Sequence, residues 1–293
     1  ITNSTFTNNQ SNSNYGGAMW LAGHAITLRG NTFAGNTAGS VGGAVYLVPC
    51  TNVEKAAAET EAYGSYDAVL ENNTFENNKA YSSGGALYIN PSTITVTTLV
   101  DRCTFTNNST DTYGGALAFD PAFDGIADNT IANVAFGKAE TTTSEEEDAE
   151  EETTLNGNYA ALRGGAIAFN SYIKENTLKN CTFRGNTALR YAGAVYYPNT
   201  YGKTTKFNPV YTVEGCTFDR NSATYDVKNG DDAGGGAILI QVNPTDTPNT
   251  VQVASLHVKN SAFTGNTATG YGGAIATRRE ADRGNARIYL NVD

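Results

Sequence analysis

The stretch Phe33-Ala34-Gly35-Asn36, with the Gly42-Gly43-Ala44 that follows it, decides the fold of this chain. The same phrase returns eight times, and in the undisturbed copies the Asn stands six residues before the first Gly. A period of about 30 residues indicates a solenoid, in which one supersecondary unit is stacked on copies of itself. In chain order the copies contain Phe6 and Asn9, Phe33 and Asn36, Phe75 and Asn78, Phe105 and Asn108, Phe136 and Asn158, Phe183 and Asn186, Phe218 and Asn221, and Phe263 and Asn266.

Each copy predicts β-strands rather than helices. The residues after Gly-Gly-Ala alternate in character, as in Val45-Tyr46-Leu47, and an apolar stretch such as Tyr211-Thr212-Val213 precedes each Phe. A period of two and many β-branched residues are typical of strands. A third, short strand is expected to carry the Phe itself. Three strands and three turns per repeat describe one rung of a parallel β-helix, so we expect an all-β fold of about eight rungs.

The repeated residues have structural roles in such a rung. The Phe side chains should stack inside at the spacing of about 4.8 Å between strands. The Asn amide should bond to the backbone and to the Asn of the next rung. The two glycines permit a sharp corner and a close approach of backbone. We therefore assign a structural role to Phe33, Asn36, Gly42, Gly43, Phe75, Asn78, Phe105, Asn108, Phe183, Asn186, Phe218, Asn221, Phe263 and Asn266.

Two further columns flank the Phe. The position two before Phe holds Cys103, Cys181 and Cys216 in three copies, which predicts buried thiols. Side chains of adjacent parallel strands do not converge, so we expect no bridge between Cys181 and Cys216. The residue just before Phe is Thr in six copies. An ice-binding face would need a second regular Thr column, and the neighbouring column is irregular, so sheet propensity explains the Thr better.

The repeat predicts a single parallel β-helix over residues 1–293, cut from a longer chain, because both ends fall inside a repeat. Insertions are expected near 49–66, 139–157, 198–208, 225–232 and 243–249. Those that follow the Gly-Gly-Ala strand share one edge of the solenoid, where insertions often mark an interaction surface. The insertion at 139–157 contains a run of acidic residues, which predicts a solvated, disordered decoration.

Composition excludes several classes of partner. The chain carries a net charge of −10, with 19 Lys+Arg and no basic run, which argues against nucleic acid. No apolar run reaches the roughly 18 residues of a membrane span. With only His24 and His257, we expect no metal and no cofactor. Among the Asn-x-Ser/Thr sequons, Asn72 and Asn180 fall on predicted turns and are the candidate glycosylation sites.

The outward positions of the strand after Gly-Gly-Ala are where an enzymatic site of a β-helix would lie. Polysaccharide cleavage needs paired carboxylates, or acidic metal ligands with a basic residue, on adjacent rungs. The outward position two after the Ala holds no ionisable carboxylate, and two residues further Asp120 stands alone between Asn90 and Asn170. We therefore expect no enzymatic activity. The tyrosines of this column (Tyr46, Tyr88, Tyr196) and Trp20 are expected to be exposed and to form a weak sugar- or protein-binding stripe.

The pairing of Phe-x-x-Asn with Gly-Gly-Ala-(Ile/Leu/Val) resembles the repeats of chlamydial polymorphic outer membrane proteins, from Phe6 to Ile275. The resemblance implies a right-handed parallel β-helix of pectate-lyase-like architecture, displayed outside the cell as an adhesin or surface scaffold. It brings no catalytic residues. The chain departs from the pattern at Ala192-Gly193-Ala194 and in the acidic insertion.

Three functions remain open from the sequence. The first is a non-enzymatic, extracellular surface module that binds a protein or a glycan on another surface through loops on one edge. The second is the subunit of an extracellular filament, assembled end to end from copies of itself through unpaired strand edges. The third is a polysaccharide-acting β-helix enzyme, for which Asp120 would be the residue to test.

Overall fold

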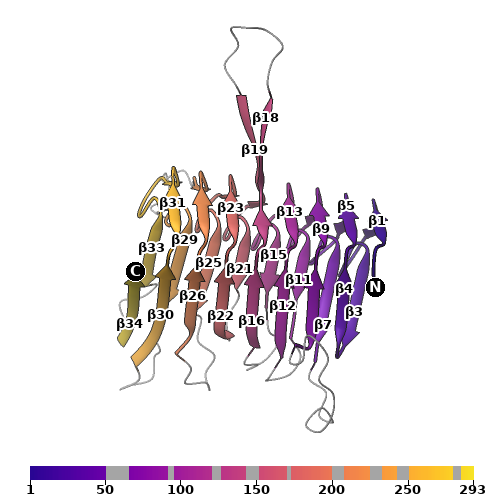
Figure 1. Cartoon of the computed structure of the whole chain (residues 1–293), viewed down its shortest axis with the longest axis horizontal. Coiled ribbons are helices and arrows are strands. Elements are labelled where there is room, and N and C mark those ends of the chain that lie inside the picture. The colour runs from indigo at the N-terminus through magenta and orange to yellow at the C-terminus, as the bar shows by residue number, and fades with distance from the viewer. Residues whose placement is uncertain are drawn as a thin grey trace.

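The computed structural model describes residues 1–50, 66–91, 96–120, 127–142, 152–169, 173–199, 208–224, 233–242, 251–279 and 285–293. These residues form a parallel β-helix of four sheets, each of eight strands (Figure 1). The prediction of an all-β solenoid of about eight rungs is confirmed. Among the described residues there is no helix that is long and apolar enough to cross a membrane.

Each rung contributes one strand to each sheet, and the four sheets are named here for their place in the repeat. The Phe sheet contains β1 (Thr5–Thr7), β5 (Thr32–Ala34), β9 (Thr74–Glu76), β13 (Thr104–Thr106), β17 (Ala135–Phe136), β23 (Thr182–Arg184), β27 (Thr217–Asp219) and β31 (Ala262–Thr264). The short sheet contains β2 (Gln10–Ser11), β6 (Thr37–Ala38), β10 (Lys79–Ala80), β14 (Ser109–Thr110), β20 (Tyr159–Ala160), β24 (Thr187–Ala188), β28 (Ser222–Ala223) and β32 (Thr267–Ala268).

The other two sheets hold the longer strands. The Gly-Gly sheet follows each Gly-Gly-Ala and contains β3 (Met19–Gly23), β7 (Val45–Pro49), β11 (Leu87–Ile89), β15 (Leu117–Phe119), β21 (Ile167–Phe169), β25 (Val195–Asn199), β29 (Ile238–Val242) and β33 (Ile275–Arg279). The return sheet leads back to the next Phe and contains β4 (Ile26–Arg29), β8 (Ala68–Glu71), β12 (Thr97–Asp101), β16 (Ala127–Ala132), β22 (Ile173–Lys179), β26 (Val210–Glu214), β30 (Val251–Lys259) and β34 (Asn285–Val292).

The rung has four strands where the sequence predicted three. The additional strand is the two-residue member of the short sheet, such as Thr37–Ala38, between the Asn and the first Gly. Its inward residue is buried in most rungs, as Ala38 and Ala80 are, and its outward residue is half-buried. Two residues are too few for a period of two to be recognised, so the repeat did not reveal this strand.

Three corners of every rung place one residue in the left-handed region of backbone space, with φ between 48° and 87°. The first corner lies three residues before the Phe, the second two residues after it (one residue after it in the fifth rung, at Gly137), and the third at the first Gly of Gly-Gly-Ala or its counterpart Ala192. Asn and Gly adopt this conformation most readily, which explains why both recur there. Asn72 and Asn180 occupy the first corner and are exposed.

The Phe side chains form a continuous stack along the inside of the helix. Ring centroids of neighbouring rungs lie 4.6–5.1 Å apart, from Phe6 at one end to Phe263 at the other. Six of these rings are fully buried: Phe33, Phe75, Phe105, Phe136, Phe183 and Phe218. The spacing follows from in-register pairing, since each Phe lies opposite the next across a parallel ladder (for example Phe33 opposite Phe75).

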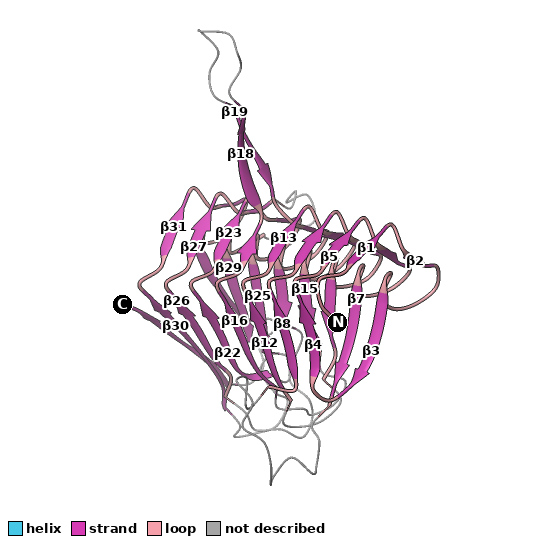
Figure 2. Cartoon of the chain, turned by 45° about the vertical axis from the view of Figure 1, so that its right-hand side comes forward, coloured by secondary structure: helices cyan, strands magenta, loops and turns pink. Residues whose placement is uncertain are grey.

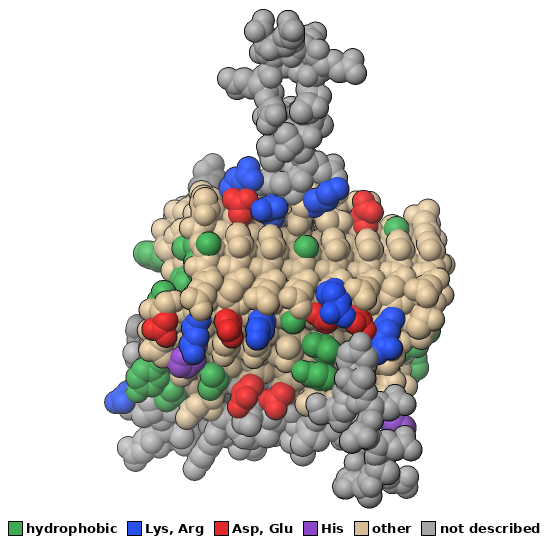
Figure 3. Space-filling view, viewed as in Figure 1, with side chains coloured by type: hydrophobic (Ala, Val, Ile, Leu, Met, Phe, Trp, Pro, Cys, Tyr) green, Lys and Arg blue, Asp and Glu red, His purple; other side chains and the backbone are tan. Residues whose placement is uncertain are grey.

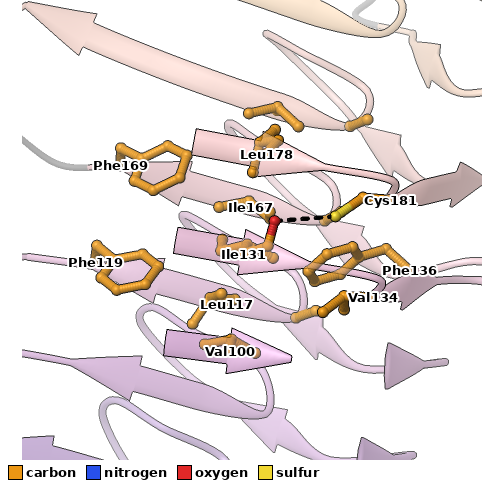
Figure 4. Packing of buried hydrophobic residues seen from close by; sticks show 14 of the residues in the cluster. Val100, Leu117, Phe119, Ile131, Val134, Phe136, Ile167, Phe169, Leu178 and Cys181 are labelled. Carbon is orange, nitrogen blue, oxygen red and sulfur yellow. Dashed lines mark hydrogen bonds between the residues drawn. The ribbon is translucent and has the colours of Figure 1, made fainter. Parts of the chain in front are cut away.

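The rest of the core has the same columnar order (Figure 4). Phe119 and Phe169 stack at 5.3 Å, and Tyr197 follows at 5.0 Å. Cys103, Cys181 and Cys216 are buried free thiols, and Cys181 Sγ lies 3.3 Å from the carbonyl oxygen of Ile131. Burial raises the pKa of Cys103 to about 11.

The second glycine of each Gly-Gly-Ala has no room for a side chain. A Cβ on Gly43 would lie 1.9 Å from the carbonyl oxygen of Gly85 in the next rung, and a Cβ on Gly193 would lie 2.1 Å from that of Gly236. The first glycine is needed for its positive φ instead, which Ala192 also adopts at 58°. The degenerate copy therefore replaces the glycine whose role another residue can fill with some strain.

One insertion projects away from the body. β18 (Lys138–Thr142) pairs antiparallel with β19 (Glu152–Asn156), and this ribbon stands out from the second corner of its rung (Figures 1 and 2). The two arms of the insertion predicted at 139–157 thus form a β-hairpin, whereas the acidic run that was predicted to be a disordered decoration lies almost wholly outside the described residues. Residues 143–151 lie outside the described part of the chain, as do all or most of the insertions near 49–66, 198–208, 225–232 and 243–249.

Candidate functional site

The outward surface of the Gly-Gly sheet gathers the most chemically varied side chains of the described residues. Two columns build it: the outward residues of the strands, and the residue just before each Gly-Gly, which pairs in register from rung to rung. We call this surface the tyrosine face. It comprises Tyr46, Tyr88, Asn90, Tyr113, Asp120, Arg163, Tyr191, Tyr196, Gln241 and Arg278.

The prediction of an exposed aromatic stripe is wrong for the tyrosines. Tyr46 and Tyr88 are each 7% exposed and Tyr196 is 1% exposed, while Trp20 is 58% exposed. The outward column is covered because residues from the adjacent column pack over it, as Val41 does over Tyr46 and Tyr191 over Tyr196. This second apolar layer could not be predicted from the strand pattern, since an outward position on a half-buried strand is ordinarily solvated.

The N-terminal half of the tyrosine face is a stack with polar ends. Tyr15, Tyr46 and Tyr88 stack in order, with centroids 4.6 Å and 5.4 Å apart. Asn90 Nδ2 donates to the Tyr46 hydroxyl at 3.0 Å, and the Tyr88 hydroxyl donates to Asp120 Oδ2. Burial, followed by the charge of Asp120, raises the pKa of the Tyr88 phenol, so this phenol stays protonated and keeps donating to the carboxylate.

The C-terminal half surrounds an arginine with tyrosines. The guanidinium carbon of Arg163 lies 5.5 Å from the ring centroids of Tyr113 and Tyr191 and 5.2 Å from that of Tyr196. Arg163 Nη1 donates to the Tyr196 hydroxyl at 2.9 Å, and that hydroxyl donates to Gln241 Oε1 at 2.7 Å. A guanidinium over aromatic faces is attracted by their negative electrostatic surface, so the rings hold Arg163 in place.

Two further arginines lie against the ring of Tyr191. The guanidinium carbon of Arg278 is 4.6 Å from the Tyr191 centroid and that of Arg190 is 5.3 Å from it. Three guanidinium groups therefore contact Tyr191 in a chain whose net charge is −10. Tyr113, Arg163 and Tyr191 were not predicted to belong to a site. The available signal was their shared position just before Gly-Gly, or Ala192-Gly193, in three successive repeats.

The face offers binding groups rather than a catalytic set. Asp120 is half-buried, and its carboxylate is already bonded to Tyr88. In the described ranges, no three His, Cys, Asp or Glu side chains are placed to hold a metal ion. The described residues of the tyrosine face thus show phenols, guanidinium groups, amides and one carboxylate, which are groups that bind sugars and anions.

The opposite side of the molecule has a different character. Figure 3 shows an uncharged band along the solenoid between two rows of charged side chains. The outward threonines of the Phe sheet, such as Thr74, are mostly half-buried. Beside the first corner Glu71 pairs with both Arg29 and Arg102, and beside the second corner Asp219 pairs with Arg184 and Arg220. These charges neutralise one another locally, so we assign no binding site to them.

The other assigned residues are placed as follows. The Phe and Asn columns and the paired glycines lie inside the solenoid or at its corners, and most are buried, so they build the rungs and offer nothing to a ligand. Asn72 and Asn180 are exposed at the first corner, and Asn72 Oδ1 accepts from Arg102 Nε at 3.2 Å. Their glycosylation stays a prediction.

Two family models match this sequence. The model of the right handed beta helix region matches residues 1–136, and that of the Chlamydia polymorphic membrane protein repeat matches residues 260–278. The chain is therefore similar to right-handed β-helix proteins over its first 136 residues and to one polymorphic membrane protein repeat near its other end. No curated protein and no solved structure matches it. The polymorphic membrane protein repeat matched at 260–278 contains Phe263, Asn266 and Gly272-Gly273-Ala274, which are the stack, ladder and corner residues of one rung.

Proposed function

We propose that this chain is a non-enzymatic module of a cell-surface or extracellular protein, and that it binds a protein or glycan on another surface. The tyrosine face and the loops that follow its strands would form the binding side. The family of the repeat supports the surface location, because its members are named as membrane proteins. The resemblance seen in the sequence supports the adhesin role.

One observation carries the non-enzymatic part of the proposal. On the described part of the tyrosine face Asp120 is the only carboxylate, and its Oδ2 accepts the hydroxyl of Tyr88. Hydrolysis of a glycan needs two carboxyl groups flanking the bond, roughly 5–10 Å apart, or a metal with acidic ligands. A single carboxylate that positions a tyrosine fits a binding surface better.

A binding assay and a turnover assay together test the proposal. The purified chain, coupled to fluorescent beads, is offered to a panel of animal and microbial cells, and bound beads are counted by flow cytometry. We expect saturable binding to at least one cell type, competed by the free chain. A glycan-degradation screen should give no new reducing ends. Turnover that Asp120→Asn abolishes would establish the enzyme instead, and absence of binding to every cell type would remove the adhesin role.

A further inference from the structure

The side chain of Arg163 is fixed by contacts with three tyrosine rings and by a hydrogen bond. It stands in the column before Gly-Gly, between Tyr113 in the rung before and Tyr191 in the rung after. Three tyrosine rings lie within 5.5 Å of its guanidinium carbon, and one of its nitrogens donates to the Tyr196 hydroxyl. Tyr196 is fixed in turn by Gln241. An arginine held on several sides is pre-organised, so it loses little freedom when it binds a ligand.

This guanidinium has no acidic partner in the part of the chain that the structure describes. Among the described residues its polar contact is the neutral phenol of Tyr196, which occupies one Nη1 hydrogen, and the other donors of the fork have no partner in that part of the chain. Four other described arginines, beside the corners that flank the Phe sheet, differ from Arg163 because each forms an ion pair with a carboxylate. They are Arg29, Arg102, Arg184 and Arg220. In a chain of net charge −10, an arginine kept away from carboxylates is a place where an external anion meets least repulsion.

The exposure of the cluster is graded. Tyr191 and Tyr196 are 1% exposed and form its buried floor, whereas Arg163 and Tyr113 remain half-buried and reach solvent. The accessible groups are therefore one planar cation and one aromatic ring side by side. A tyrosine ring offers an apolar face to the ring of a sugar, while the arginine fork matches a carboxylate or sulfate through parallel hydrogen bonds.

We propose that Arg163, held by Tyr113, Tyr191 and Tyr196, is the recognition point for the acid group of an acidic glycan. The shared chemistry of the ligand is a carboxylate or sulfate carried on a sugar ring. Tyr113 supplies the contact with the ring of the sugar. This inference rests on the proposed function, since it names the class of partner that the tyrosine face recognises.

Calorimetric titration of the full chain with defined oligosaccharides tests the inference. The probes are tetragalacturonate, which carries carboxylates alone, dextran sulfate, which carries sulfates alone, and maltotetraose, which is neutral. We expect binding of at least one acidic probe and none of maltotetraose. Binding that is lost as the carboxylates become protonated near pH 3–4 assigns a uronate, and binding that persists there assigns a sulfate.

Variants locate the site. Arg163→Met should weaken binding at least tenfold, and Arg163→Lys should weaken it less, because an ammonium keeps the charge but cannot form the bidentate contact. Tyr113→Leu should weaken binding several-fold while leaving the charge unchanged. The matched control is Arg184→Met, which removes one positive charge from strand β23 of the Phe sheet and should leave the affinity for the acidic probe within twofold. Thermal unfolding of each variant verifies that the rungs remain intact.

Several outcomes would overturn the inference. These are the absence of binding to both acidic probes, equal affinity of the wild type and Arg163→Met, equal weakening by Arg184→Met, or equally tight binding of a poly-glutamate peptide. The bead assay separates this inference from the proposed function. Beads that still bind cells when they carry Arg163→Met would leave the adhesin role standing and refute the acidic-glycan site.

Discussion

In adjacent rungs, two nitrogens of Asn78 donate hydrogen bonds to one side-chain oxygen of Asn108. Oδ1 of Asn108 accepts from the backbone amide and from Nδ2 of Asn78, each at 3.0 Å. Nδ2 of Asn78 also donates back to the Phe33 carbonyl at 2.9 Å. The same three bonds repeat along the solenoid, so one Asn per rung ties together three consecutive rungs.

We expect Asn108→Ala to destabilise the chain by roughly 3 kcal/mol or more, because it leaves the Asn78 amide groups and the Phe75 carbonyl without partners in a buried site. Urea unfolding measures the loss. Asn9→Ala is the matched control, since Asn9 is exposed and begins the ladder, and it should cost well under half as much. Equal losses of unfolding free energy at both positions would show that burial of the Asn ladder does not increase its contribution to stability.

The two small residues of the degenerate Ala192-Gly193 corner should respond in opposite ways. Gly193→Ala would place a methyl 2.1 Å from the Gly236 carbonyl oxygen, so we expect a loss of at least about 2–3 kcal/mol or failure to fold. Ala192→Gly relieves a positive φ but removes a buried methyl, and these effects offset each other to within about 1 kcal/mol. Differential scanning calorimetry compares the two variants. A harmless Gly193→Ala would contradict the tight approach of the two backbones.

Tyr197→Phe should stabilise the protein by about 1 kcal/mol. The Tyr197 hydroxyl is buried and has no hydrogen-bond partner among the residues that the structure describes, while Phe169 already fills the equivalent place in the preceding rung and stacks on the Tyr197 ring at 5.0 Å. An unpaired buried hydroxyl costs about 1–3 kcal/mol, which Phe avoids at nearly the same volume. Chemical denaturation shows whether the unfolding free energy rises or falls on this substitution. Tyr211→Phe is the control, because the Tyr211 hydroxyl donates to the Pro198 carbonyl at 3.2 Å and its removal should destabilise.

Stability should fall at alkaline pH. The pKa of Cys103 is raised to about 11 in the folded chain, and burial also raises the pKa values of the Tyr46, Tyr197 and Tyr211 phenols. Since these folded pKa values exceed the unfolded ones, the unfolded chain loses protons first as the pH rises. Stability is therefore full below about pH 8.5 and declines above it.

Cys103→Val isolates the thiol in this pH dependence, because Val134 already occupies the same column in the next rung. The variant should lose less stability than the wild type between about pH 9 and pH 11, with a difference of roughly 2 kcal/mol. Unfolding free energies measured at a series of pH values provide the comparison. Identical slopes for both proteins would mean that the thiol titrates alike in the folded and unfolded chains.

The sequence predicted the fold well because stacking imposes identity on each rung. Phe33 and Asn36 recur since each contacts its own counterpart above and below, so the repeat is a direct record of those contacts. The strand Thr37–Ala38 was missed because two residues carry no periodicity. The β18–β19 hairpin was missed because the composition of the acidic run outweighed the weak strand pattern of its two arms.

The candidate site was less predictable than the fold. Asp120 and the outward tyrosines were identified by counting along single strands, and that count places them correctly on the outer face. Their burial depends on a second column, which reaches over them from the corner before Gly-Gly. Arg163 and Tyr113 lie 50 positions apart in sequence. The in-register pairing of their rungs brings them together, so that the Arg163 guanidinium contacts the Tyr113 ring.

The in-register pairing has a mechanical consequence. The strands run across the long axis, so the ladder bonds that join neighbouring rungs, including those of the asparagines, lie along it. A pulling force along that axis loads each ladder one bond after another, as in a zipper, instead of shearing many bonds at once. The solenoid should therefore lengthen under tension by releasing single rungs at modest force and rewind when the load is removed, which makes it an extensible spacer rather than a rigid rod.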